Sequence, residues 1–188
     1  MEECRPCLAL VTILAFAAAG APSSAQSEFL ATIEADQIVG GTTSTATGSA
    51  TMILNVAEDA LTYSITLIGL DLDGLQTPGD ADDDVTAMHF HAAPPGMNGG
   101  VVFGLIAPNH DTDDLVIDPV AGTLDGIWEN TDVNPLSAQL ATLKAGGLYL
   151  NVHTTEFPGG AIRGQVEPVV FRDGFESGNV SAWSLSVP

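Results

Sequence analysis

Short segments in which apolar and polar residues alternate recur along this chain, and they constrain its fold more than any other feature. In residues 61–67 the odd positions are Leu, Tyr, Ile and Leu, whereas the even positions are Thr, Ser and Thr. Such a period of two is typical of a strand with one buried face. Clusters of Gly, Asp, Asn and Pro separate the segments, so we expect an all-β fold, an antiparallel β-sandwich or barrel of about eight strands. The expected strands are residues 28–35, 47–56, 61–68, 85–91, 101–106, 123–128, 148–153 and 161–166.

One short helix is expected among these strands. Asn134 suits the N-cap and Pro135 the first helical position, and leucines follow at helical spacing up to Lys144. Gly146 then suits the end of the helix. We expect this helix to cover one edge or end of the β-structure.

The first residues differ from the rest of the chain. Residues 7–19 are almost wholly apolar but too few to span a bilayer, and residues 22–25 are small and suit signal-peptidase cleavage. We expect a signal peptide over residues 1–25, one β-domain over 26–168 and a C-terminal tail over 169–188 that contains a DGFESG-type motif found in exported bacterial proteins. The protein is then secreted, extracellular or periplasmic, or associated with the cell surface, and no membrane span is expected after signal removal.

Charge and cysteine usage limit what the mature domain can do. Both cysteines, Cys4 and Cys7, lie in the leader, so we expect no disulfide and no thiolate site. Without Glu2, Glu3 and Arg5, the 24 acidic and 4 basic residues become 22 and 3, a net charge of −19. Such an acidic surface repels nucleic acid and anionic membranes and attracts divalent cations or basic partners. The expected partner is an unknown extracellular protein or a divalent cation.

An acidic loop is one candidate cation site. Residues 71–84 carry six aspartates and Gly74, and carboxylates on a glycine-containing loop suit calcium. The spacing does not match the twelve-residue calcium loop, so a solvated connector is the alternative. A calcium-dependent adhesion module is therefore one functional hypothesis.

Three of the four histidines lie on expected strands. His89 and His91 alternate with Met88 and Phe90, so both imidazoles leave the face opposite to the core, and His153 ends a second alternating segment in the same way. Three converging imidazoles suit copper or zinc, with a fourth position filled by water, His110 or a carboxylate. The alternative is that these histidines bind backbone groups and order the glycine-rich loops 94–100 and 158–160.

Four motifs, taken in order, resemble the CHRD domain, a module named after its occurrence in chordin. The motifs are residues 87–91 (AMHFH), 95–102 (PGMNGGVV), 147–154 (GLYLNVHT) and 157–166 (FPGGAIRGQV), and Phe29 and Gly48 match the usual opening. The resemblance spans residues 28–167 and implies an immunoglobulin-like β-sandwich or barrel, remotely similar to copper/zinc superoxide dismutase. It implies no general enzymatic activity.

The similarity to superoxide dismutase gives individual residues a role. His89, His91 and His153 resemble the copper ligands of that enzyme, and Arg163 resembles the arginine that steers its anionic substrate. The zinc-site histidines and the disulfide are missing, since only His110 remains there, followed by Asp111, Asp113 and Asp114.

We therefore expect a non-enzymatic CHRD-type module with a binding or structural role. The alternative is a copper or zinc protein with a superoxide-dismutase-like site, and an enzymatic activity, if present, would be that of a superoxide-dismutase-like oxidoreductase. Other reactions lack a motif, because no serine lies in a Gly-x-Ser-x-Gly elbow.

Overall fold

The computed structural model describes residues 26–169, and the expected signal peptide and nearly all of the C-terminal tail lie outside them. Nine strands form one sheet in the order β5-β4-β8-β9-β1-β2-β3-β7-β6, and every pair of neighbours is antiparallel. The strands are β1 (Ser27–Glu34), β2 (Thr47–Leu54), β3 (Ala60–Ile68), β4 (Val85–Ala92), β5 (Gly100–Ile106), β6 (Val116–Asp118), β7 (Thr123–Glu129), β8 (Leu148–Thr154) and β9 (Ile162–Pro168). The predicted all-β antiparallel fold is confirmed.

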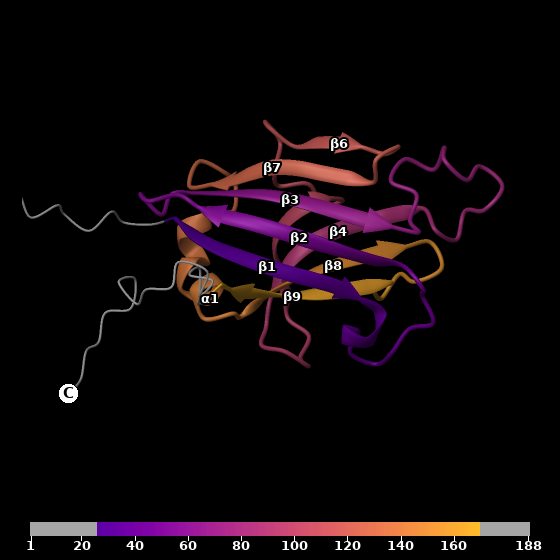
Figure 1. The fold of residues 1–188 in the computed structure, drawn as a ribbon, viewed down its shortest axis with the longest axis horizontal. Coiled ribbons are helices and arrows are strands. Elements are labelled where there is room, and N and C mark those ends of the chain that lie inside the picture. Colours follow the sequence, from indigo (N-terminus) through magenta and orange to yellow (C-terminus); the bar gives the residue numbers. More distant parts are fainter. Residues whose placement is uncertain (1–25, 170–188) are drawn as a thin grey trace, which may run out of the picture.

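The sheet curls so that its two halves face each other across the core. Figure 1 shows β1, β2, β3 and β7 in front of β4 and β8, with β9 at the lower edge where the sheet turns from one half to the other. Gly164 of β9 permits this turn, because a Cβ atom there would lie 2.8 Å from Ile33 and 2.9 Å from the Thr32 carbonyl oxygen of β1. The result is a half-barrel with a single core.

The alternating residues predicted to face inward form that core. Tyr63 and Ile65 of β3 are buried, as are Met88 and Phe90 of β4 on the opposite half. The Trp128 ring stacks on Phe103 at 4.6 Å between centroids, and Phe90 packs 5.6 Å from Trp128. The period of two thus assigned the buried face of these strands correctly.

The predicted helix is present but shorter and differently capped. A 3₁₀ turn, η2 (Leu136–Ala138), precedes a one-turn helix, α1 (Leu140–Lys144), and a second 3₁₀ turn, η1 (Ala35–Gln37), follows β1. Asn134 makes no cap, because its side chain instead bonds His110. Leu136 and Leu143 are buried, so the segment packs against the core as expected.

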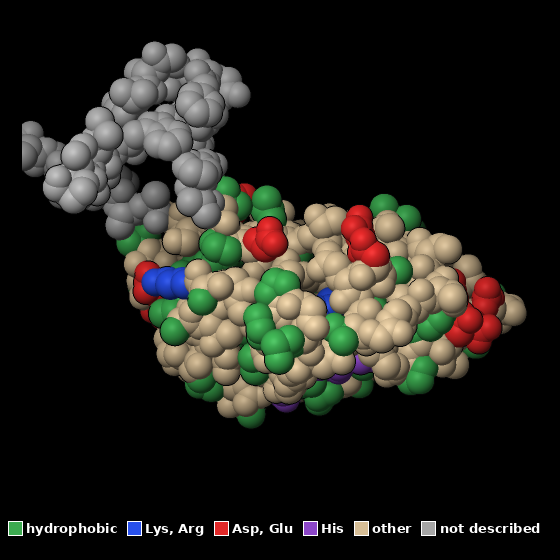
Figure 2. All heavy atoms as spheres, turned by 90° about the horizontal axis from the view of Figure 1, so that it is seen from below, with side chains coloured by type: hydrophobic (Ala, Val, Ile, Leu, Met, Phe, Trp, Pro, Cys, Tyr) green, Lys and Arg blue, Asp and Glu red, His purple; other side chains and the backbone are tan. Residues whose placement is uncertain are grey.

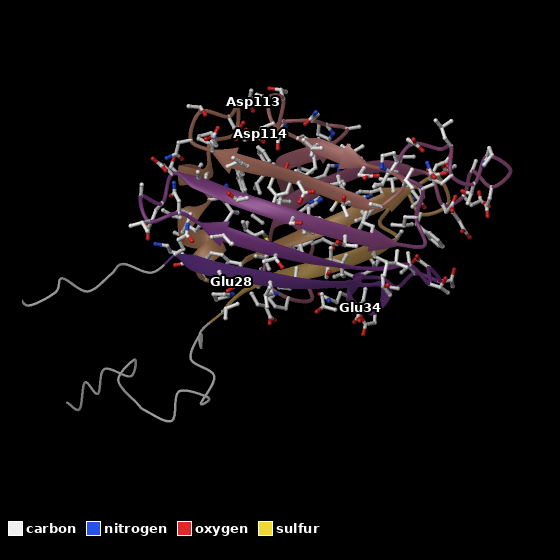
Figure 3. The ribbon with its side chains drawn as sticks, turned by 45° about the horizontal axis from the view of Figure 1, so that its top comes forward. Glu28, Glu34, Asp113 and Asp114 are labelled. Carbon is white, nitrogen blue, oxygen red and sulfur yellow. The ribbon has the colours of Figure 1, made fainter. Side chains whose placement is uncertain are left out.

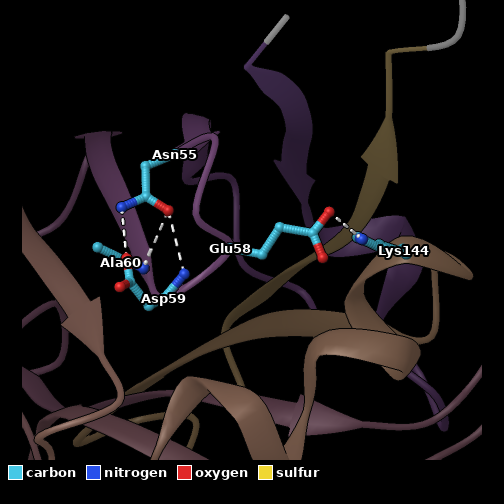
Figure 4. A network of polar contacts seen from close by, with 5 residues as sticks. All are labelled: Asn55, Glu58, Asp59, Ala60 and Lys144. Atoms are coloured by element: carbon cyan, nitrogen blue, oxygen red, sulfur yellow. Dashed lines mark hydrogen bonds and ion pairs between the residues drawn. The ribbon is translucent and has the colours of Figure 1, made fainter. Parts of the chain in front are cut away.

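Polar contacts tie the hairpin between β2 and β3 to this helix (Figure 4). The side-chain oxygen of Asn55 accepts hydrogen bonds from the backbone N–H groups of Asp59 and Ala60, at 3.0 and 3.4 Å. Glu58, in the same turn, forms an ion pair with Lys144 of α1.

No helix within residues 26–169 is long and apolar enough to cross a membrane.

Candidate metal centre

Three histidines from two neighbouring strands meet on the face of the sheet that points away from the core. Strand β4 carries His89 and His91, and β8, its antiparallel neighbour, carries His153 opposite Ala87. One ring nitrogen from each of the three lies within 4.8 Å of the others. The His89 ring centroid is 5.1 Å from that of His91 and 4.8 Å from that of His153. Two strands 60 residues apart therefore bring three imidazoles to one place.

Each of the three rings is oriented by a backbone carbonyl. His91 Nδ1 lies 2.9 Å from the Gly99 oxygen, and His153 Nδ1 lies 2.9 Å from the Pro158 oxygen. His89 Nε2 lies 3.3 Å from the Ala107 oxygen. Because a carbonyl oxygen only accepts, these three nitrogens carry the protons. The lone pairs are thus on His89 Nδ1, His91 Nε2 and His153 Nε2.

The free nitrogens face one another or a single amide. His89 Nδ1 is 3.1 Å from His91 Nε2, so two lone pairs oppose each other with no proton between them. His153 Nε2 lies 3.1 Å from the side-chain nitrogen of Asn151, which donates to it. The other amide atom, Asn151 Oδ1, is buried and has no hydrogen-bond partner. The ring nitrogens and the Asn151 oxygen thus gather several hydrogen-bond acceptors at one point, with few donors to satisfy them.

Burial favours the neutral form of His89 and His91. Burial, together with the neighbouring His153 and His91, lowers the pKa of His89 from 6.5 to about 4. Burial also lowers the pKa of His91, against an opposing hydrogen bond to Gly99. A neutral imidazole is the form that binds a metal ion, so protons compete weakly for this pair near neutral pH.

Side chains and a loop cover the face of the sheet that carries the histidines. From the alternation pattern alone, this face was expected to point outward. His89 is 6% and His91 9% exposed, and histidine atoms reach the surface only at small points in Figure 2. The Tyr149 ring stacks on His91 at 4.8 Å with 10° between the planes. The Arg163 guanidinium lies 3.5 Å from the Tyr149 centroid. Only His153 is partly exposed, so access to the three rings is from its side.

Arg163 is on the predicted face but is only 2% exposed. Its guanidinium donates to the Met97 carbonyl oxygen at 2.8 Å and to Gln165 Oε1 at 3.0 Å. The contact with Met97 fixes the loop that carries Gly99, the partner of His91, whereas Gln165 lies on β9 with Arg163. Arg163 therefore holds the site's covering loop, and the steering of an anion stays a prediction.

His110 is not part of the three-histidine group. Its Nδ1 accepts a hydrogen bond from the Gly104 N–H at 2.8 Å and lies 2.9 Å from the Asn134 side-chain nitrogen. Its nitrogens are also absent from the group of atoms within 4.8 Å. Asn151, and not His110, is the side chain that bonds His153 Nε2. Its place two residues before His153 on one strand was the available sequence signal.

The acidic loop of residues 71–84 is held by its first residue. Asp71 is buried, and its two carboxylate oxygens accept hydrogen bonds from four backbone N–H groups between Asp73 and Thr77. These bonds lower the pKa of Asp71, although burial opposes them. In the part of the chain that the structure describes, the loop contributes to neither group of closely spaced metal-binding side chains. A calcium site in this loop stays a prediction.

The second such group comprises Asp111, Asp113 and Asp114, on the segment between β5 and β6. Sequence reasoning named these residues only as neighbours of His110. Their carboxylates offer oxygens within 4.8 Å of one another.

A family model supplies the identity of the fold. The CHRD domain model matches residues 29–166, which include every strand that forms the two halves of the core and all three converging histidines. No curated protein and no solved structure matches the chain. The match covers most of the chain and agrees with the motifs that carry the histidines, so this chain belongs to the CHRD domain family.

Proposed function

We propose that this CHRD domain binds a transition-metal ion, copper or zinc, through His89 Nδ1, His91 Nε2 and His153 Nε2. The observation that carries the proposal is the pair of opposed lone pairs on His89 and His91, 3.1 Å apart. Two neutral imidazoles at this distance repel each other unless a cation lies between them. Zinc binds imidazole at about 2.0–2.1 Å with tetrahedral angles, which separates two ligand nitrogens by roughly 3.3 Å.

The surroundings of the rings also fit a metal centre. In metal sites the non-ligating nitrogen of a histidine usually donates to a carbonyl or carboxylate, which fixes the ring and raises its basicity. All three rings have such a carbonyl, at Gly99, Ala107 and Pro158. Metal binding requires His153 Nε2 to release the Asn151 amide, and rotation of that amide would present its unpaired Oδ1 or admit a water as the fourth ligand.

Metal analysis and calorimetry of the purified domain test this proposal. Protein produced without chelator is analysed for copper and zinc, then stripped with EDTA and titrated with zinc. We expect about one ion per chain and a rise in melting temperature on adding zinc, because a ligand that binds only the folded state stabilises it. His91→Gln keeps a polar group of similar size but removes one ligand, and it should lower zinc affinity at least tenfold.

His110→Gln is the matched control, because His110 is the one described histidine outside the group. It should leave zinc affinity unchanged. Equal zinc binding by wild type, His91→Gln and His89→Gln would refute the proposal, as would the absence of any zinc- or copper-dependent shift in wild type.

We also propose that the domain acts outside the cytoplasm after removal of residues 1–25. The apolar run and the small residues that follow it support this proposal. N-terminal sequencing of protein recovered from the periplasm or medium should begin at Gln26. Recovery of cytoplasmic protein that retains Met1 would contradict export.

A further inference from the structure

A second cluster of metal-binding side chains lies away from the histidines. Asp111, Asp113 and Asp114 follow β5, and Figure 3 shows Asp113 and Asp114 beside each other at the edge of the sheet near β6 and β7. The backbone N–H groups of His110 and Asp111 both bond the Gly104 carbonyl oxygen, which fixes the start of this segment. The N–H of Ile127 in β7 donates to Asp114 at 2.8 Å and fixes its end.

Asp111 carries an observation that an ordinary surface aspartate lacks. Its carboxyl group is 0% exposed, and although Oδ2 accepts a hydrogen bond from the Tyr63 hydroxyl, Oδ1 has no hydrogen-bond partner. The contact with Tyr63 depends on Gly126, because a Cβ atom there would lie 2.3 Å from the hydroxyl and 2.8 Å from Asp111 Oδ2. A buried carboxylate oxygen without a partner is costly, so this group indicates a missing cation or donor.

No basic side chain balances these charges. The lysines and arginines within residues 26–169 are Lys144, which pairs with Glu58, and Arg163, which lies under the loop beside the histidines. Burial raises the pKa of Asp114, and the charges of Asp111 and Asp113 raise it further against the hydrogen bond from Ile127. Asp132 responds in the same way to burial and to Asp111 and Asp113. The raised pKa values of Asp114 and Asp132 thus reflect burial and mutual repulsion that no lysine or arginine among residues 26–169 offsets.

We propose that Asp111, Asp113 and Asp114 form a second cation site, which takes a hard divalent ion, calcium in particular. The donor atoms are all carboxylate oxygens, which hard cations prefer over the nitrogens that select copper or zinc. Oxygens around one calcium ion lie at about 2.3–2.6 Å from it, so two of them are at most roughly 5 Å apart. The three carboxylates meet that limit, at 4.8 Å or less.

This site differs from the acidic loop of residues 71–84. There Asp71 has both oxygens bound to backbone N–H groups, so it has little capacity left for an ion. Asp84 has one unpaired buried oxygen, but it is not grouped with two further close carboxylates within the described residues. Both segments are rich in aspartate. Within the described residues, only the group of Asp111, Asp113 and Asp114 combines a buried carboxylate that has an unpaired oxygen with carboxylate oxygens within 4.8 Å of one another.

Calcium titration of the EDTA-stripped, buffer-exchanged domain tests the proposal. Calorimetry should show one calcium ion per chain, and the melting temperature should rise by about 5 °C or more at a calcium concentration ~100 times Kd. Asp113→Asn should weaken calcium binding at least tenfold without unfolding the protein, because Asp113 is exposed. Asp80→Asn, in the exposed part of the acidic loop, is the matched control and should leave calcium binding unchanged.

The histidines belong to a separate group of side chains, so in the absence of zinc His91→Gln should bind calcium as wild type does. A wild-type melting temperature unmoved by 100-fold increases of calcium into the millimolar range would overturn the proposal. Equal affinities of wild type and Asp113→Asn, an equal loss in Asp80→Asn, or binding of zinc in preference to calcium at this cluster would overturn it as well.

Discussion

Replacement of Arg163 by methionine should destabilise the domain by about 3 kcal/mol. The guanidinium makes a charge-assisted hydrogen bond to the Met97 oxygen, of a type that contributes about 1.5–3 kcal/mol. Its stacking on Tyr149, away from water, adds about 2 kcal/mol. In the wild type, the desolvation cost of burying the arginine offsets part of this stabilisation. In the variant, the carbonyl groups that lose their donor stay buried without a partner, which lowers its stability. Methionine fills similar space but replaces neither contact.

Urea unfolding of the EDTA-treated protein measures this difference. The midpoint should fall at unchanged m-value, and the melting temperature should fall by roughly 8 °C. Lys144→Met is the control, because Lys144 has only an exposed ion pair with Glu58, which contributes less than about 1 kcal/mol. Arg163→Lys should lose most of the stability, since an ammonium group cannot reproduce the planar fork. If Arg163→Met were as stable as Lys144→Met, the structural role assigned to Arg163 would be wrong.

Three further predictions concern other parts of the domain. The pKa of His89 is about 4 in the folded state and 6.5 in the unfolded state, so the unfolded state binds more protons between these pH values. In urea titrations, the free energy of unfolding of metal-free wild type should therefore fall by up to about 3 kcal/mol relative to His89→Gln as the pH falls from 6.5 to 4. Asp71→Asn should lower the melting temperature and speed proteolysis within residues 72–80, because the amide accepts fewer of the N–H bonds that hold this loop. Trp128→Phe should cost about 2 kcal/mol in chemical unfolding, since it removes the 2.7 Å hydrogen bond to the Asn134 oxygen and leaves a cavity beside Phe103; an unchanged midpoint would contradict this packing.

The period of two predicted eight of the nine strands because those strands turn apolar residues toward the core. In β4, β8 and β9 the opposite face is buried as well, which the alternation did not predict. Strand β6 was missed, since Val116–Asp118 is only three residues long and fully exposed, and it forms through pairing with β7 alone. The helix was predicted as one element capped by Asn134, but the Asn134 side chain bonds His110, and the segment divides into η2 and α1. Pairing with the adjacent strand decided the first difference, and the contact between Asn134 and His110, 24 residues apart in sequence, decided the second.

Alternation along the strands placed His89 and His91 on one face, but it carried no information about which strand lies beside β4. The pairing of β4 with β8 brings His153 to them, and the neighbouring strand β9 brings Arg163 over Tyr149. The low exposure of the histidines follows from these partners. The hydrogen bond to the other oxygen of Asp111 likewise comes from Tyr63, 48 residues away, so the local sequence shows only a run of acids.

The two proposed centres are joined by one short segment between β5 and β6. The Ala107 carbonyl orients His89, and the next residues turn back so closely that a Cβ atom on Gly104 would lie 1.5 Å from the Pro108 oxygen. The same turn ends at Asp111, whose N–H bonds Gly104. Calcium bound at Asp111 should therefore order the Ala107 carbonyl before zinc binds the histidines. We expect bound calcium to raise zinc affinity by about fivefold. Zinc must then raise calcium affinity by the same factor, and calorimetric zinc titrations that give one Kd with and without calcium would show that the segment transmits nothing.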